Sequence, residues 1–240
     1  MTDSTATGHD LNERYAAARA LLRAWQNTTV GSVDGDAIDD AGRSLNLKRS
    51  HWSARLNDIR SAILADQVIF GVRRRGKNLV QRAFEREEHD KFAGSWSVED
   101  AVRRLRYRIL RVKGPGDGIR VPTEDVLRAM PVTLIDVQMS RVAAEGMAVA
   151  GRMVPFDDCE MFTGAAIPVQ GEAGRVLVEK IMGHGLLTRC RNSHKQPMSA
   201  DEEADLAALC IRTLLALGCD RSIRYADADS PTDESTAAAE

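Results

Sequence analysis

The sequence lacks several features that would assign it to a familiar class. Its four cysteines are far apart and show no C-x-x-C spacing. This distribution favours reduced thiols over a disulfide framework. No apolar run follows a basic leader, and no run approaches the roughly 20 residues that a membrane span requires. We therefore expect a cytoplasmic protein that does not enter a membrane.

Motifs for catalysis and cofactor binding are also scarce. The segment "GPGDG" lacks the lysine of a phosphate-binding loop, and "GAAIPVQGEAG" lacks the strand-then-helix context of a dinucleotide fold. A zinc site could be drawn from Cys159, His184, Cys190 and His194, but only Cys190 and His194 have a tolerable spacing. A buried cysteine and exposed histidines are the favoured interpretation. We expect neither an enzyme nor a cofactor.

The sequence does contain a strong segregation of charge. Residues 41–113 hold 18 Lys and Arg against 8 Asp and Glu, a balance of +10, although the whole chain carries a net charge of -2. A basic block in an acidic chain is typical of proteins that bind a phosphate backbone. The alternative is that these charges only keep helical surfaces soluble.

A candidate DNA-reading element lies inside this block. Ala37, Ile38, Ala41 and Leu45 predict one helix, and Asn46 can adopt the left-handed conformation of a tight turn. A second apolar stripe follows at helical spacing, through Trp52, Leu56, Ile59 and Ile63. The stretch "AGRSLNLKRSHWSARL" resembles the helix-turn-helix proteins. The resemblance implies that the second helix enters the major groove of DNA, with base and phosphate contacts from Lys48, Arg49, Ser50, His51, Ser53 and Arg55.

The next segment extends this interpretation. "QVIFGVRRRGKNLVQRAF" predicts two β-rich runs around a basic loop. A helix-turn-helix followed by a β-hairpin is the order of a winged-helix domain. The wing would carry cations to DNA phosphates or a minor groove, namely Arg73, Arg74, Arg75 and Lys77.

Later segments predict more helices and a second winged unit. Ser97 is expected to cap a helix that runs through Val112, and "KGPGDG" to end it. Thr123 is a candidate cap for another helix. The stretch "TGAAIPVQGEAGRVLVEKIMGHGLLTRCRNSHKQ" resembles the winged helices of MarR-type regulators, with a wing at "TRCRNSHK". Ser199 and Glu202 predict a capping box for a last, strongly apolar helix.

Together these patterns predict a mainly α fold with small β-hairpins and two winged-helix-like units. The expected organisation is a flexible N-terminus (1–9), a basic helix-turn-helix/winged-helix domain (10–113), a linker (114–120), a second helical winged-helix-like and dimerisation domain (121–219) and a disordered acidic tail (220–240).

The expected function is sequence-specific binding of double-stranded DNA by a homo-oligomer, such as a dimeric transcriptional regulator. Two alternatives stay open. One is a DNA-binding adaptor, such as a plasmid replication initiator or a phage small terminase subunit. The other is a protein-interaction scaffold that does not bind DNA, because fold alone does not settle function.

Overall fold

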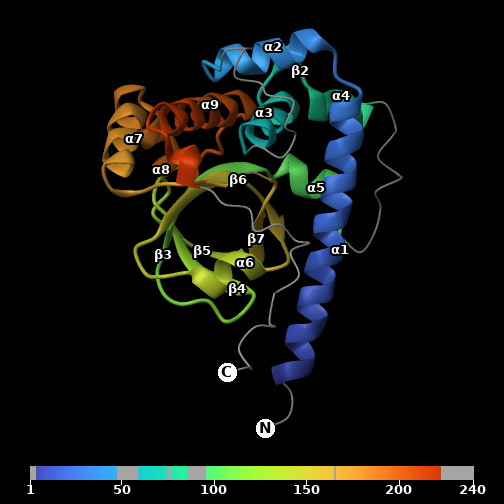
Figure 1. Cartoon of the computed structure of the whole chain (residues 1–240), viewed down its shortest axis with the longest axis vertical. Helices are drawn as coiled ribbons and strands as arrows, with labels where there is room; N and C mark the ends of the chain where they lie inside the picture. Colours follow the sequence, from blue (N-terminus) through green and yellow to red (C-terminus); the bar gives the residue numbers. More distant parts are fainter. Residues whose placement is uncertain (1–3, 48–58, 75–76, 86–95, 165, 223–240) are drawn as a thin grey trace, which may run out of the picture.

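The computed structural model describes residues 4–47, 59–74, 77–85, 96–164 and 166–222. A five-stranded β-barrel lies at the centre, and helices from both ends of the chain pack against it (Figure 1). The helices before the barrel are α1 (Ser4–Gly31), α2 (Gly35–Ser44), α3 (Ile59–Phe70), α4 (Leu79–Glu85) and α5 (Val98–Arg103). Those after it are α7 (Gly171–Gly183), α8 (Leu186–Asn192), α9 (Ala200–Ala216) and the short 3-10 helix η3 (Cys219–Ser222).

The barrel closes through pairing between distant segments. Its strands are β3 (Arg106–Val112), β4 (Arg120–Asp125), β5 (Met130–Ile135), β6 (Ala148–Phe156) and β7 (Cys159–Phe162). β3, β4 and β5 form an antiparallel meander, and β6 pairs antiparallel with both β7 and β3. β5 and β7 are parallel and pair only at Leu134 and Glu160. Because β5 and β7 pair at one position only, the seam between them has the fewest backbone pairings of any neighbouring strands in the barrel.

Three apolar clusters explain how the barrel and helices pack. The interior is filled by Leu110, Leu134, Met153 and their neighbours, and α6 (Val137–Val142), between β5 and β6, packs against this cluster through Met139. Outward-facing side chains of β3 and β6 pack against α7, α8 and α9. Another outer cluster joins β6 and β7 to α1, α3, α4 and α5.

The outer face of β4 and β5 is less covered than the rest of the barrel. Pro122 and Pro131 are exposed there, and Glu124 and Thr133 are partly exposed. Besides these strands, two short pairs occur: β8 (Ile167–Pro168) extends the sheet beside β6, and β1 (Arg73–Arg74) forms a hairpin with β2 (Lys77–Asn78).

The expectation of a mainly α fold with two winged-helix-like units is wrong, because the closed barrel is the central element. Ser97 caps helix α5 as predicted. The predicted length of this helix is wrong, because it ends at Arg103 and does not continue through Val112. Residues 106–112 then form β3, which pairs with strands on both sides. The apolar residues of "RYRILRV" satisfy a helical spacing and a strand alternation at once, and long-range pairing selects the strand.

The second predicted winged unit is wrong for a similar reason. Ile167 and Pro168 form β8 rather than the end of a helix, and Thr123 lies in β4 rather than at a helix cap. Helix α7 occurs where the MarR-like resemblance implied a helix, but "TRCRN" continues as helix α8 rather than forming a wing. Residues 114–120, expected as a linker, connect β3 to β4 of the same barrel.

Several local predictions are confirmed. Asn46 has a positive φ of 55°, as expected for the tight turn after α2. Ser199 and Glu202 form the predicted capping box of α9. The apolar stripe of α9 is buried within the chain itself. The predicted second helix of the helix-turn-helix falls mostly on residues 48–58, which lie outside the described residues.

Candidate functional site

Three charged side chains meet inside one end of the barrel. Arg108 points inward from β3 and lies between two carboxylates. Its Nη1 donates to Oδ2 of Asp125 at 2.7 Å, and its Nε donates to Oε2 of Glu160 at 2.5 Å. Nη2 donates to the second oxygen of Glu160, so this pair is bidentate. Such a geometry fixes both side chains strongly.

The electrostatics of Arg108 follow from this arrangement. Burial lowers the pKa of its guanidinium, but hydrogen bonds and charge attraction from Glu160, together with Asp125, outweigh burial and raise it. Only 8% of the Arg108 side chain and none of Asp125 is exposed, whereas 22% of Glu160 is exposed. Glu160 is therefore the member of this group that a ligand can reach.

A second arginine links this group to helix α9. Arg128 donates to Asp125 at 3.1 Å and to Oε1 of Glu203 at 2.7 Å. The other oxygen of Glu203 accepts from the backbone N–H of Tyr107 at 3.0 Å, and Nε of Arg106 lies 3.5 Å from Glu203. The three arginines and three carboxylates of this network balance one another. It holds α9 on the barrel and fixes the position of Glu160.

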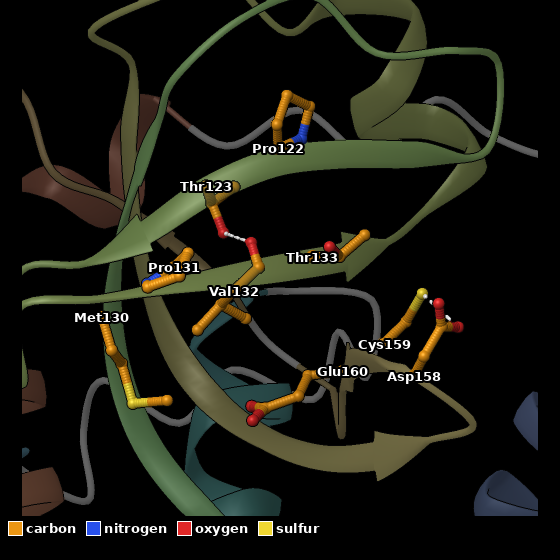
Figure 2. A pocket seen from close by; sticks show the side chains of 9 residues that line it. All are labelled: Pro122, Thr123, Met130, Pro131, Val132, Thr133, Asp158, Cys159 and Glu160. Atoms are coloured by element: carbon orange, nitrogen blue, oxygen red, sulfur yellow. Dashed lines mark hydrogen bonds between the residues drawn. The ribbon is translucent and has the colours of Figure 1, made fainter.

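A pocket of about 330 Å³ opens beside Glu160, at the β5–β7 seam. Figure 2 shows the side chains of Met130, Val132 and Glu160 around a common space. The volume lies at the lower end of the range of small-ligand sites. The wall residues come from β4, from β5 and from β7 with its preceding turn, and they are Pro122, Thr123, Met130, Pro131, Val132, Thr133, Asp158, Cys159 and Glu160.

The polar groups of the wall are mostly hydrogen-bond acceptors. Asp158 and Glu160 are the carboxylates there, and none of the described residues that line the wall is an arginine or a lysine. Asp158 is 72% exposed and receives a weak contact of 3.3 Å from Arg120. Thr123 already donates its hydroxyl to the carbonyl of Val132 at 2.6 Å. The pocket is therefore suited to a ligand that donates hydrogen bonds or carries positive charge.

The wall offers little for catalysis. Cys159 is its sole thiol, and burial, with the neighbouring Asp158 carboxylate, raises the pKa of that thiol to about 11. A protonated thiol is a poor nucleophile. None of the described residues that line the pocket is a histidine or a serine. Among the described residues, no group of three or more His, Cys, Asp or Glu is placed to hold a metal ion.

The predicted DNA-binding residues are only partly described. Arg73 forms an ion pair with Asp201 at the start of α9, and Nζ of Lys77 lies 2.6 Å from Oε1 of Glu85. Arg74 belongs to β1. The other predicted contacts, Lys48, Arg49, Ser50, His51, Ser53, Arg55 and Arg75, lie outside the described residues. The two predicted β-rich runs are wrong, because residues 59–70 and 79–85 form helices α3 and α4, and only the short β1–β2 pair lies where the basic loop was expected. Two of the cations predicted for this loop pair with acids of the same chain.

The same pairing occurs across the basic block. Several of its cations contact carboxylates from outside residues 41–113, including Arg60 with Asp220 and Lys113 with Glu124. Arg106 and Arg108 likewise pair with acids from later segments. A substantial part of the charge segregation in the sequence is thus neutralised when the chain folds. The +10 balance alone is no longer an argument for nucleic acid.

The pocket residues were missed at the level of sequence. A signal for the barrel, though not for the pocket itself, was present in the alternation of "RYRILRV" and in the long apolar run "AVAGRMVPF", which form β3 and β6 and are typical of strands. No local pattern indicates that Arg108, Asp125 and Glu160 meet, because they come from three different strands.

Comparison with known proteins places the chain in a family. Residues 10–195 match the model of a family of unknown function, DUF7986. The chain belongs to this family. The range of the DUF7986 match includes every barrel strand and all pocket residues, and it ends before α9. No curated protein and no solved structure matches the chain. In the described part of this DUF7986 protein, no helix is both long enough and apolar enough to span a membrane.

Proposed function

We propose that this chain is a non-catalytic binding module whose barrel pocket holds a cationic, hydrogen-bond-donating group. The observation that carries the proposal is the pocket at the β5–β7 seam, where the described wall residues include two carboxylates and no arginine or lysine. An amino or guanidinium group fits this chemistry, whereas a phosphate would meet like charge.

The topology of the barrel supports the same location. The strands lie in the order β3-β4-β5-β7-β6 around the barrel, and helix α6 lies between β5 and β6 in the chain. This is the topology of an OB-fold barrel. OB-folds bind ligands on the face of their second and third strands and on nearby loops. Here that face is formed by β4 and β5, and both line the pocket. The analogy concerns position only, because one fold hosts many functions.

Rigidity is a further argument for binding. Arg108 holds Glu160 by two hydrogen bonds, and Asp125 and Arg128 hold Arg108 in turn. A carboxylate fixed in this way loses little conformational entropy when a ligand binds. In the described part of the chain, each Glu160 oxygen accepts one hydrogen bond from Arg108, and its second lone pair can accept from a ligand without releasing Arg108.

Butylguanidinium is a suitable probe, because it carries the cation and a short apolar chain. With about 8 non-hydrogen atoms contributing roughly 0.5 kcal/mol each, its binding free energy would be about -4 kcal/mol, or a Kd of about 1 mM. Titration calorimetry should show this affinity for the intact chain, whereas butyrate, which carries the opposite charge, should not bind.

Two variants make the test specific. Asp158→Asn removes a pocket carboxylate that is mostly exposed, so the fold should be retained, and we expect binding to weaken about fivefold. Glu124→Gln is the matched control, because it removes the same charge from β4 at a residue that does not line the pocket. If both variants weaken binding equally, the probe responds to net charge alone and the proposed site is wrong.

DNA binding stays a prediction, and it now depends mainly on residues outside those described. The winged-helix argument for it no longer holds, because the fold is a barrel. Salt-dependent binding to duplex DNA would still test it directly.

A further inference from the structure

β5 has a backbone edge next to the pocket that strand pairing uses only at one end. Its pairing with β4 extends from Met130 to Ile135, whereas its pairing with β7 is limited to Leu134. In the described part of the chain, no other strand pairs with Pro131–Thr133 on the side away from β4. This edge borders the pocket, because Pro131, Val132 and Thr133 all line it.

The direction of the backbone groups on this edge follows from a contact of β4. The carbonyl of Pro122 accepts a hydrogen bond from the N–H of Lys113 at 2.8 Å, so it faces β3 rather than β5. Thr133 lies directly opposite Pro122 in the antiparallel ladder. Because the Pro122 carbonyl faces away from β5, Pro122 and Thr133 form a non-hydrogen-bonded pair. In a pair of this type, the backbone N–H and C=O groups of each residue point away from the partner strand. The N–H of Thr133 therefore faces the pocket side.

The same alternation places the carbonyl of Pro131 on that side, since Pro131 lies two residues earlier in the strand. Proline has no N–H, and at such an outward position this loses no bond to β4. The available pair is thus the Pro131 carbonyl and the Thr133 N–H. These groups flank Val132 and match the acceptor and donor that one residue of a parallel strand requires.

We propose, building on the function proposed above, that the β5 edge at Pro131–Thr133 binds one residue of an extended basic peptide as a short parallel strand. That residue donates its N–H to the carbonyl of Pro131 and accepts from the N–H of Thr133. Paired residues present their side chains on the same face of a sheet. The peptide side chain therefore lies on the face of Val132, and an arginine or lysine there reaches Asp158 and Glu160. This is strand addition to a sheet edge with a side-chain pocket for specificity.

The test compares three tripeptides on the intact chain. The parent is acetyl-Val-Arg-Val-methylamide. One derivative carries an N-methyl group on the arginine, and the matched control carries it on the following valine, whose N–H faces away in an extended strand. We expect arginine methylation to weaken binding about tenfold, because it removes one hydrogen bond and adds a clash. Valine methylation should change binding less than twofold, within roughly 0.4 kcal/mol.

A protein variant tests the same contact from the other side. Thr133→Pro removes a backbone N–H that faces away from β4, and Thr133→Val keeps this donor while removing the hydroxyl. The first should lose the preference for the parent peptide over its arginine-methylated form. The second should retain that preference. If Thr133→Pro does not fold, the peptide comparison decides alone.

The outcomes separate the two proposals. Equal affinity of all three peptides, with butylguanidinium still dependent on Asp158, overturns strand addition and leaves the pocket proposal intact. Binding of butylguanidinium without binding of the parent peptide also overturns strand addition. If neither probe binds, the proposed function itself is wrong, and the inference fails with it.

Discussion

The buried pair between Arg152 and Asp66 gives the sharpest prediction about stability. Arg152 lies on β6 and is 3% exposed, and Asp66 lies on α3 and is 7% exposed. Nη1 of Arg152 donates to Asp66, and Nη2 donates to Oε1 of Gln67 at 2.7 Å. Thr163 donates to the second Asp66 oxygen at 3.0 Å. The group joins the N-terminal helices to the barrel.

The perturbation is Asp66→Asn, which keeps the shape but removes the negative charge. Arg152 would then be buried without a compensating charge, and breaking such a pair costs about 3–5 kcal/mol. Urea unfolding followed by circular dichroism at pH 7 measures this loss as a lower midpoint at an unchanged m-value.

Two further variants show whether the loss of stability in Asp66→Asn comes from the unpaired charge of Arg152. In the double variant with Arg152→Met, no unpaired charge remains, so we expect at least 1 kcal/mol of the loss to be recovered. Glu172→Gln is the control, since its exposed pair with Arg175 should leave stability unchanged. A loss below about 1 kcal/mol for Asp66→Asn would refute the reasoning, because the pair would then be solvated.

Three more predictions follow from other parts of the structure. The pKa of Glu202 is lowered from 4.5 to about 2 by hydrogen bonds from Arg189 and Ser199. The stabilisation is therefore present above about pH 4.5 and lost toward pH 2, so Glu202→Gln should cost about 1 kcal/mol at pH 7 and nothing near pH 2. Burial raises the pKa of Cys190 to about 11, and all four cysteines are buried; a thiol reagent should label the native chain only as fast as it unfolds. Replacing Arg73, Arg74 and Arg75 together by Ala should flatten the salt dependence of duplex DNA binding by roughly one to three charges if the DNA prediction is right. An unchanged slope would exclude these residues as phosphate contacts.

The sequence predicted local features well where the signal itself was local. The capping box at Ser199 and Glu202 and the left-handed Asn46 depend on neighbours within a few residues, and both are confirmed. The β-rich runs predicted around the basic loop are wrong, because they form helices α3 and α4, and the short hairpin at Arg73–Asn78 occupies the residues that were expected to form the loop.

The barrel could not be predicted in the same way, because its pairings are long-range. β3 pairs with β6 about 40 residues later, and that pairing decides that "RYRILRV" is a strand. The arginines of this segment also favoured the wrong prediction of a helix. Arg108 in a helical pattern implies an exposed cation, whereas in the barrel it is buried by Asp125 and Glu160 from other strands. The charge balance of residues 41–113 was misleading for the same reason.

Methionine methyl NMR tests most directly whether the pocket at the β5–β7 seam binds a cationic group. Met130 lines the pocket and is 43% exposed, while Met147 and Met182 are exposed elsewhere, at 43% and 58%. With ¹³C-methyl methionine and butylguanidinium, we predict a saturable shift of the Met130 signal and none for Met147 or Met182. Equal shifts at all three methyls, or no shift at Met130 up to concentrations well above the expected Kd, would contradict the claim.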